Sequence, residues 1–348
     1  MKALVFYEFR EGCLELREVP EPEVGPADVL LRVKAAAVCG SDIERVHCRS
    51  SSTVTPVIIG HEFCGVVERV GAEVRRWRPG DRVVSENTGY VCGECYACRT
   101  GKFLNCPERK LLGGKLDGGF AEFVRIPGDV LAIYPQSLRR LPDNLSFEAG
   151  AILEPSCNAY FALIQEGGLQ LGQKAVIFGP GAIGLFAVAW AKLAGAGQII
   201  LVGGSENRLE LGRALGAHQT VNYRRAGGVP DAVGSLIGPN QADLVLDASG
   251  GGNVLADAIA IARPLGKIVN IGWAGEHRVN LDPAMRKGLD IIGHLGYDTT
   301  SWDRVLFLAG QNALDYRKFI SAVFPLEEWR EAFKGMEERR YLKAVFTF

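Results

Sequence analysis

Four cysteines stand within one short stretch of the chain, VCGECYACRTGKFLNC. Their spacing, C-x2-C-x2-C-x7-C, lets a short loop fold four thiolates into a tetrahedron around one zinc ion. Four sulfur ligands close the coordination shell, so such a site braces a loop and leaves no position for a substrate. The alternatives are a disulfide cluster or four surface thiols without a joint role. The predicted structural zinc ligands are Cys92, Cys95, Cys98 and Cys106.

A second group of residues has the types that a catalytic zinc requires. VCGSDIE supplies Cys39, IGHEFCG supplies His61 and Glu62, and LEPSC supplies Glu154. One thiolate, one imidazole and a carboxylate leave a coordination position open for water or substrate. Each residue alone is more typical of a buried cysteine or a hydrogen-bonded polar group. Their joint occurrence with a nucleotide-binding motif favours the metal.

That motif is VIFGPGAIG, which has the G-x-G-x-x-G spacing directly after an apolar strand and before an apolar helix. The glycines permit a tight turn and the close approach of a pyrophosphate, whose charge then lies at a helix N-terminus. The alternative is a plain strand-to-helix connection. The predicted dinucleotide-binding residues of this loop are Gly179, Gly181, Ala182, Ile183 and Gly184.

The end of the next predicted strand bears on the choice between NAD and NADP. An NAD site usually has an acidic residue there to hold the ribose hydroxyls. This chain has LVGGSENR instead, with Gly203 and Gly204 where the acid would stand. Without that carboxylate a 2′-phosphate is not repelled, so we predict that NADP is favoured over NAD. The candidate partners of the phosphate are Ser205, Arg208, Tyr223 and Arg224, although Arg208 is also typical of a solvated helix face.

The elements that must position these residues follow two different patterns. Up to about residue 135 the chain has short β-rich runs between Gly, Pro and Asp, which predicts an irregular, mostly β, barrel-like domain. Later, apolar strands alternate with helices, which predicts βαβ units and a doubly wound parallel sheet. We expect a catalytic domain at 1–156 and 295–348, with a four-cysteine lobe at about 88–112, and a dinucleotide-binding domain at 157–294.

Composition limits the kind of partner. The 348 residues carry nine cysteines and a formal net charge of −1. No block of like charge supports nucleic-acid or membrane binding, so we expect a small-molecule substrate. The N-terminal stretch alternates like a strand and does not resemble a signal peptide, so we expect a cytoplasmic protein. Thiols are reduced there, which favours metal binding over disulfides.

Together these motifs resemble the zinc-dependent medium-chain dehydrogenase/reductase family, nearest its sorbitol (polyol) and threonine dehydrogenase branches. The resemblance covers essentially the whole chain, through CGSD, GHEFCG, the four-cysteine lobe, DGGFAEF, LEP and GPGAIG in the family's order. It implies an α/β protein with a GroES-like catalytic domain and a Rossmann domain. It also implies two zinc ions per chain, hydride transfer between an alcohol and a nicotinamide, and a homo-oligomer, either dimer or tetramer.

The resemblance also implies roles for single residues. Zinc at Cys39, His61 and Glu62 lowers the pKa of a bound alcohol, and Asp42 orients His61. Glu154 is an additional or exchanging ligand, or a base that reaches the metal-bound water. Ser41 takes the substrate hydroxyl proton. Many relatives have a proton-relaying histidine where this chain has Glu44, whose carboxylate can do the same job.

One departure leaves the substrate open. The sorbitol-type branch tends to have an arginine near the stretch HLGYDTTSW, and this chain has none there. His294 and Tyr297 are candidates to face the pocket instead, or they belong to the core. We expect oxidation of a secondary alcohol of a polyol, sugar alcohol or derivative, and a threonine-like amino alcohol or an aminocyclitol stays open. The rival classes are a zinc-stabilised binding module and a catalytically silent nucleotide-binding relative.

Overall fold

The computed structural model describes residues 1–49, 53–273 and 278–348. By its internal contacts the chain forms two compact units, Met1–Glu154 with Leu306–Phe348 (unit 1) and Pro155–Val305 (unit 2). The domain limits expected from the sequence stay a prediction. Among the described residues, no helix has both the length and the apolar character needed to cross a membrane.

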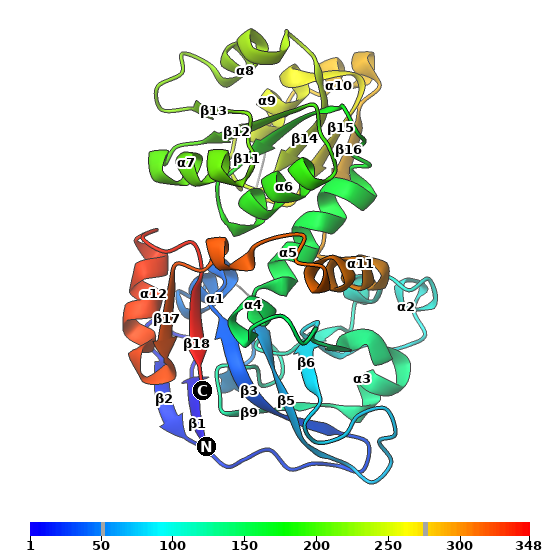
Figure 1. Ribbon diagram of the computed structural model, residues 1–348, viewed down its shortest axis with the longest axis vertical. Helices are drawn as coiled ribbons and strands as arrows, with labels where there is room; N and C mark the ends of the chain where they lie inside the picture. The colour runs from blue at the N-terminus through cyan, green and yellow to red at the C-terminus, as the bar shows by residue number, and fades with distance from the viewer. Residues whose placement is uncertain (50–52, 274–277) are drawn as a thin grey trace. The chain divides into compact units, whose positions relative to one another are not determined.

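Unit 1 is built on a sheet in the order β10-β6-β5-β3-β18-β17, with β9 also paired to β3. The C-terminal strand β18 lies beside β3, so two strands that are about 300 residues apart in sequence are neighbours in one sheet (Figure 1). The strands are β3 (Val29–Ala37), β5 (Glu62–Val70), β6 (Arg82–Ser85), β9 (Phe123–Ile126), β10 (Leu138–Arg140), β17 (Ala322–Pro325) and β18 (Ala344–Thr347).

Two smaller sheets complete the β-structure of unit 1. Strands β2 (Leu14–Glu18), β1 (Lys2–Phe6) and β4 (Val57–Ile58) pair in that order, and β7 (Thr88–Tyr90) pairs with β8 (Lys110–Leu111). Short helices fill the connections. They are α1 (Gly40–Val46), α2 (Tyr96–Arg99), η1 (Phe103–Asn105), α3 (Gly128–Ile133), η2 (Pro135–Ser137), α4 (Phe147–Ala151), η4 (Tyr316–Phe319), η5 (Leu326–Glu328) and α12 (Trp329–Glu337).

Unit 2 contains a parallel six-stranded sheet in the order β13-β12-β11-β14-β15-β16. Central strands such as β11 are buried along nearly their whole length, as expected of a parallel sheet covered on both faces. Helices α6 and α7 pack together as one group, and α8, α9 and α10 form another (Figure 1). This arrangement confirms the predicted doubly wound α/β fold.

The bounds of the unit 2 elements follow the predicted alternation. The strands are β11 (Lys174–Phe178), β12 (Gln198–Gly203), β13 (Gln219–Asn222), β14 (Ala242–Asp247), β15 (Ala262–Asn270) and β16 (Asp290–Gly293). The helices are α5 (Leu153–Tyr160), the π-helix η3 (Phe161–Glu166), α6 (Ala182–Leu193), α7 (Glu206–Leu215), α8 (Val229–Ile237), α9 (Val254–Ile261), α10 (Asp282–Lys287) and α11 (Thr299–Gly310). Helices α5 and α11 contain the two points where the chain passes between the units.

Candidate active site

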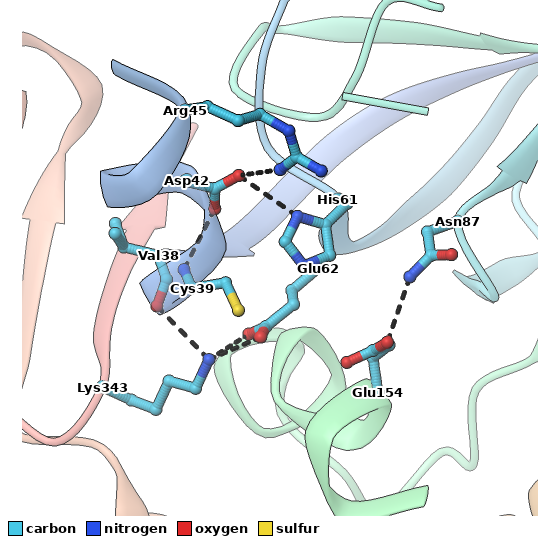
Figure 2. Close-up of polar contacts among 9 residues, drawn as sticks. All are labelled: Val38, Cys39, Asp42, Arg45, His61, Glu62, Asn87, Glu154 and Lys343. Atoms are coloured by element: carbon cyan, nitrogen blue, oxygen red, sulfur yellow. Dashed lines mark hydrogen bonds and ion pairs between the residues drawn. The ribbon is translucent and has the colours of Figure 1, made fainter. Parts of the chain in front are cut away.

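Three neighbouring strands of unit 1 bring charged side chains to one edge of the sheet. Cys39 follows the end of β3, Glu62 begins β5, and Lys343 immediately precedes β18. Both β5 and β18 run antiparallel to β3, and Ala37 near the end of β3 pairs with Glu62 and Val345. The strand register therefore places residues that are far apart in sequence at one site (Figure 2).

The predicted catalytic metal donors come together at this edge. The Cys39 sulfur, an imidazole nitrogen of His61 and a carboxylate oxygen of Glu62 all lie within 4.8 Å of one another. His61 and Glu62 are buried, with 6% and 0% of their surface exposed. A thiolate, an imidazole and a carboxylate form a donor set that suits zinc, and three protein ligands leave a fourth position free for another oxygen. The residues present therefore fit a catalytic zinc ion.

Asp42 organises two of these donors from the third position of α1. Its carboxylate accepts hydrogen bonds from the Cys39 backbone N–H at 3.0 Å, from His61 Nδ1 at 3.1 Å and from Arg45 at 3.1 Å. Because Nδ1 of His61 is the donor toward Asp42, Nε2 keeps its lone pair for a metal. Burial opposes ionisation of Asp42, but His61 and Arg45 hold the pKa of the carboxyl below its usual value.

Lys343 is a member of this site that the sequence analysis missed. Its Nζ lies 2.5 and 2.6 Å from the two carboxylate oxygens of Glu62 and donates to the Val38 carbonyl at 3.3 Å (Figure 2). Burial raises the pKa of Glu62, an effect that Lys343 opposes. Burial also opposes ionisation of Cys39, but Lys343 and His61 lower the pKa of its thiol to about 6. The site therefore favours a thiolate, which is the form that binds metal.

The other predicted catalytic residues have different surroundings. Glu154 is the second residue of α5 and is not among the donors grouped within 4.8 Å, but its Oε1 accepts a hydrogen bond from Asn87 Nδ2 at 3.2 Å. Ser41 is half-buried at the second position of α1. Glu44, on the same helix, is exposed and pairs with Arg49 at 3.2 Å. Their roles stay predictions.

The four cysteines of the four-cysteine lobe also converge, with all ligand atoms within 4.8 Å of one another. The Cys92 sulfur lies 3.9 Å from that of Cys98 and 3.6 Å from that of Cys106. These distances fit a tetrahedron with Zn–S bonds of about 2.3 Å, whose edges are about 3.8 Å. Backbone N–H groups, first that of Cys95, lower the pKa of Cys92 to about 7. All nine cysteines of the chain are free thiols, so the disulfide alternative is wrong.

The glycine loop of unit 2 has the backbone that its sequence demands. Gly179 follows β11 with a φ of 93°, which favours glycine, and Gly181 caps α6. A Cβ on Gly184 would lie 1.9 Å from the Gly179 carbonyl oxygen, so this position admits no side chain. Ala182 and Ile183 form the first turn of α6. The N-terminus of α6 thus has the form of a pyrophosphate site.

The residues predicted to choose between NAD and NADP lie near the carboxyl ends of β12 and β13. Gly203 pairs with Asn222, and the Tyr223 N–H donates to the Gly203 carbonyl at 3.1 Å. A Cβ on Gly203 would lie 2.6 Å from the ring of Pro180 in the glycine loop. The packing of this loop therefore excludes an acidic side chain at position 203. Arg224 is exposed directly after Tyr223.

Ser205 and Arg208 belong to the same edge of unit 2, at the start of α7. Ser205 is the N-terminal cap of that helix, and Arg208 lies half-buried in its first turn. Their neighbour Glu206, which no sequence motif marks, accepts a hydrogen bond from Asn222 at 3.0 Å and lies 3.4 Å from Arg225. The hydrogen bond from Asn222 lowers the pKa of Glu206 below its usual value.

His294 and Tyr297 are packed within unit 2. The two ring nitrogens of His294 lie 2.6 Å from Glu166 and 2.8 Å from Asn158, and its side chain is fully buried. Tyr297 is 3% exposed and packs edge-on against Trp302. These contacts support the core interpretation of both residues.

Comparisons with known proteins match both halves of the chain. The family model described as "Alcohol dehydrogenase GroES-like domain" matches residues 25–136, and that described as "Zinc-binding dehydrogenase" matches residues 182–310. These matches confirm the GroES-like part of the predicted fold class.

Relatives of this chain cover nearly its whole length. The L-threonine 3-dehydrogenase of Bacillus subtilis strain 168 is 35% identical over an alignment of 352 positions, which covers 99% of this chain and 98% of the relative. The D-arabitol-phosphate dehydrogenase of Enterococcus avium is 33% identical over 328 residues, or 93% and 91% of the two chains. The solved structure of 2R,3R-butanediol dehydrogenase from Bacillus subtilis matches with a TM-score of 0.89 and 27% identity, covering 100% of this chain and 99% of that one.

Identity above 30% along the full length of such relatives is decisive for the family, and the two metal-binding groups and the glycine loop agree with it. The predicted zinc sites and nicotinamide cofactor are thereby supported at the level of the family, with a small molecule as substrate. The chain belongs to the zinc-containing medium-chain alcohol dehydrogenases, oxidoreductases that act on a CH–OH group.

Proposed function

We propose that this enzyme oxidises a secondary alcohol of a polyol, sugar alcohol or related polar small molecule to a ketone, with NADP favoured over NAD. The observation that carries the proposal is the group formed by Cys39, His61 and Glu62, whose three donors leave a fourth metal position for a substrate oxygen. The alcohol carbon loses a hydride to the nicotinamide and the hydroxyl loses its proton, so the products are a ketone, the reduced nicotinamide and a proton.

The protein's own groups prepare the site for this reaction. A zinc ion held by Cys39, His61 and Glu62 would supply Lewis-acid chemistry, which lowers the pKa of an alcohol. Asp42 fixes the tautomer and orientation of His61, while burial shields His61 and Glu62 from water. Within the proposal, Ser41 accepts the hydroxyl proton and Glu44, which is exposed, transfers it to solvent. Glu154 acts as an additional ligand or as a base.

The preference for NADP is supported by the packing around Gly203. An acidic residue at this position would bind the ribose of NAD and repel the phosphate of NADP, and Pro180 leaves no room for one. Tyr223 and Arg224 follow β13 at the neighbouring strand end, where a hydroxyl and a guanidinium suit a phosphate. Ser205 and Arg208 belong to the same proposed phosphate site.

The substrate class is supported by the names of two relatives and one neighbour. D-arabitol-phosphate and butanediol dehydrogenases act on hydroxyl-bearing carbon chains, which favours a polyol or its derivative. L-Threonine 3-dehydrogenase supports an amino alcohol as the second candidate.

We also propose that the enzyme is cytoplasmic and forms a dimer or tetramer. Sedimentation equilibrium would measure the oligomeric state directly.

The test is a panel of substrates offered to the zinc-loaded enzyme. The rate of each reaction is measured by the absorbance of the reduced nicotinamide that it forms. D-Sorbitol, D-arabitol phosphate, 2,3-butanediol and L-threonine are each offered with NADP and with NAD. We expect turnover of a hydroxylated compound and a higher kcat/KM with NADP. Turnover of L-threonine alone would replace the polyol assignment by the amino-alcohol one, and a higher kcat/KM with NAD would overturn the cofactor preference.

A matched variant tests the assignment of the metal site. Cys39→Ser should keep the fold and the zinc of the four-cysteine lobe but lose the second zinc and the turnover. Full activity in this variant would contradict the role of Cys39. Cys13→Ser serves as the control, because Cys13 is a buried thiol of unit 1 outside both metal-binding groups.

A further inference from the structure

A chain of polar contacts runs from the four-cysteine lobe to Glu154. Arg109 stands three residues after Cys106, and its backbone N–H donates to the Cys106 carbonyl at 3.0 Å. Its guanidinium donates to Asn87 Oδ1 at 2.6 Å and to the Thr88 hydroxyl at 3.1 Å. Asn87 then donates from Nδ2 to Glu154 Oε1 at 3.2 Å. These contacts connect a predicted zinc ligand of the lobe to a residue of the proposed catalytic site.

The chemistry of the partners fixes the orientation of the Asn87 amide. A guanidinium can only donate hydrogen bonds, so it must face the amide oxygen. A carboxylate can only accept, so Glu154 must face the amide nitrogen. The amide thus has one arrangement in which both contacts are satisfied.

The backbone of Asn87 is held as firmly as its side chain. The residue is 2% exposed and adopts a φ of 59°, a left-handed conformation that asparagine and aspartate tolerate better than most residues. Its N–H donates to the Ser85 hydroxyl at 3.0 Å, and its carbonyl accepts from the Leu112 N–H at 2.8 Å. The Nδ2 donor is therefore presented to Glu154 from a fixed position.

The hydrogen bond from Asn87 occupies one carboxylate oxygen of Glu154, and the other oxygen makes no hydrogen bond with Asn87. Figure 2 shows the second carboxylate oxygen directed toward the side on which Glu62 and Lys343 lie. Holding one oxygen limits the rotation of the carboxylate and favours single-oxygen contact with anything bound at the metal site.

We propose that Asn87 and Arg109 are positioning residues, which orient Glu154 for the catalytic metal and couple the four-cysteine lobe to the reaction. The inference rests on the proposed function of Glu154 at that metal. It gives the lobe a second role besides bracing a loop, because the backbone that carries Arg109 is anchored at Cys106. Loss of a residue that orients a metal-site group typically costs about 10- to 100-fold in metal affinity or activity.

The sharpest variant is Asn87→Asp. Aspartate keeps the size, the tolerance for the left-handed backbone and an acceptor for Arg109, but it replaces the N–H that Glu154 needs by an oxygen and adds a negative charge beside that carboxylate. The probe is cobalt(II) in place of zinc, because its visible absorption reports the ligands around the metal. We expect a changed cobalt spectrum and metal affinity about 10- to 100-fold lower at the catalytic site, with the lobe metal retained.

A double-mutant cycle shows whether the effect runs through Glu154. Glu154→Gln alone should change the cobalt spectrum and kcat, and adding Asn87→Asp should then cost little more, because coupled residues are not additive. Fully additive losses would overturn the proposal. So would an Asn87→Asp variant with the parent's cobalt spectrum and metal affinity.

Arg109→Met tests the other end of the contact chain and serves if Asn87→Asp does not fold. It should shift the cobalt spectrum in the same direction, whereas Arg99→Met, at an exposed arginine of the same lobe, should not. Equal cobalt spectra for the parent, Arg109→Met and Arg99→Met proteins would overturn the role of Arg109. If the parent enzyme oxidised no alcohol of the panel, the proposed function would fail, while the cobalt spectra would still decide the positioning role.

Discussion

Lys343 places a buried positive charge where a metal ion would also bring positive charge. Its ammonium contacts both oxygens of Glu62, and both side chains are almost fully buried. In the metal-free protein this pair keeps a buried carboxylate from being uncompensated. When zinc binds, the cation takes over part of that task, so the lysine and the metal compete for the same carboxylate.

This competition predicts that Lys343→Met has different effects with and without zinc. In the metal-free protein the free energy of unfolding should fall by about 3 to 5 kcal/mol, because removing one partner strands the other charge. With zinc bound the loss should be smaller, and zinc should bind more tightly to the variant at a pH where the Cys39 thiol is ionised in both proteins. Urea unfolding of the chelator-treated and zinc-reloaded proteins measures both. Equal losses in the two states would contradict the argument, and Lys318→Met, at an exposed lysine, is the control.

Arg224 carries a second prediction at the scale of one residue. If its guanidinium contacts the 2′-phosphate, Arg224→Ala should weaken NADP binding about tenfold, in line with the loss of a hydrogen bond to a charged group. NAD lacks that phosphate, so its affinity should stay the same. Fluorescence titration with each reduced nucleotide measures the two dissociation constants. A parallel loss for both nucleotides would show that Arg224 does not contact the phosphate.

At the scale of elements, two glycines of the glycine loop differ in whether the packing of the fold requires them. Gly184 has no room for a side chain, since a Cβ there would meet the Gly179 carbonyl oxygen. Gly181 has an ordinary φ of −80° and open space at its Cβ position. The fold alone therefore requires glycine at position 184 and accepts alanine at position 181.

The two positions should consequently respond differently to alanine. Gly184→Ala should lower the melting temperature and the nucleotide affinity together, because the loop must move. Gly181→Ala should keep the melting temperature but raise the dissociation constant of the nucleotide by about tenfold or more, because its methyl group takes the space of the approaching pyrophosphate. Calorimetry and nucleotide titration separate the two effects. Unchanged nucleotide binding in a folded Gly181→Ala protein would remove position 181 from the pyrophosphate site.

Local patterns in the sequence were sufficient for the elements and for much of the site. The strand–glycine–helix period predicted the parallel sheet, and the cysteine spacing predicted the four-sulfur group that the structure brings together. The contacts of Lys343 and Asn87 could not be predicted in this way. They depend on strand pairings across long sequence separations, such as β3 with β18, and no local motif marks either residue. The packing of Pro180 over Gly203 likewise appears only once β11 and β12 are side by side.

At the scale of the whole molecule, His47 links parts of unit 1 that are far apart in sequence. Its ring nitrogens lie 2.6 Å from Glu11 in the β1–β2 connection and 3.0 Å from Glu337 at the end of α12. The sequence separations are 36 and 290 residues, so this side chain ties the N-terminal strands to the C-terminal helix. A neutral imidazole can donate only one hydrogen bond, whereas the protonated ring donates to both carboxylates.

The hydrogen bond to Glu11, followed by the contact with Glu337, raises the pKa of His47 above its ordinary value of 6.5. Because the pKa is raised on folding, the stabilisation is fully present below that ordinary value and is lost as the pH rises through the folded pKa. His47→Gln should therefore lower the stability of the enzyme at about pH 5.5 and have a smaller effect at about pH 8.5.

The size of this effect is limited by the partial exposure of the pair. A contact of this kind contributes about 0.5 to 1 kcal/mol, equivalent to a shift of about 1 to 4 °C in melting temperature for a unit of this size. Calorimetric scans of the parent and the variant at both pH values measure the difference. His218→Gln, at a histidine of unit 2, controls for the general effect of replacing a histidine by glutamine. A loss in the His47 variant that is equal at both pH values would mean that its contact with the two glutamates does not depend on the protonated ring.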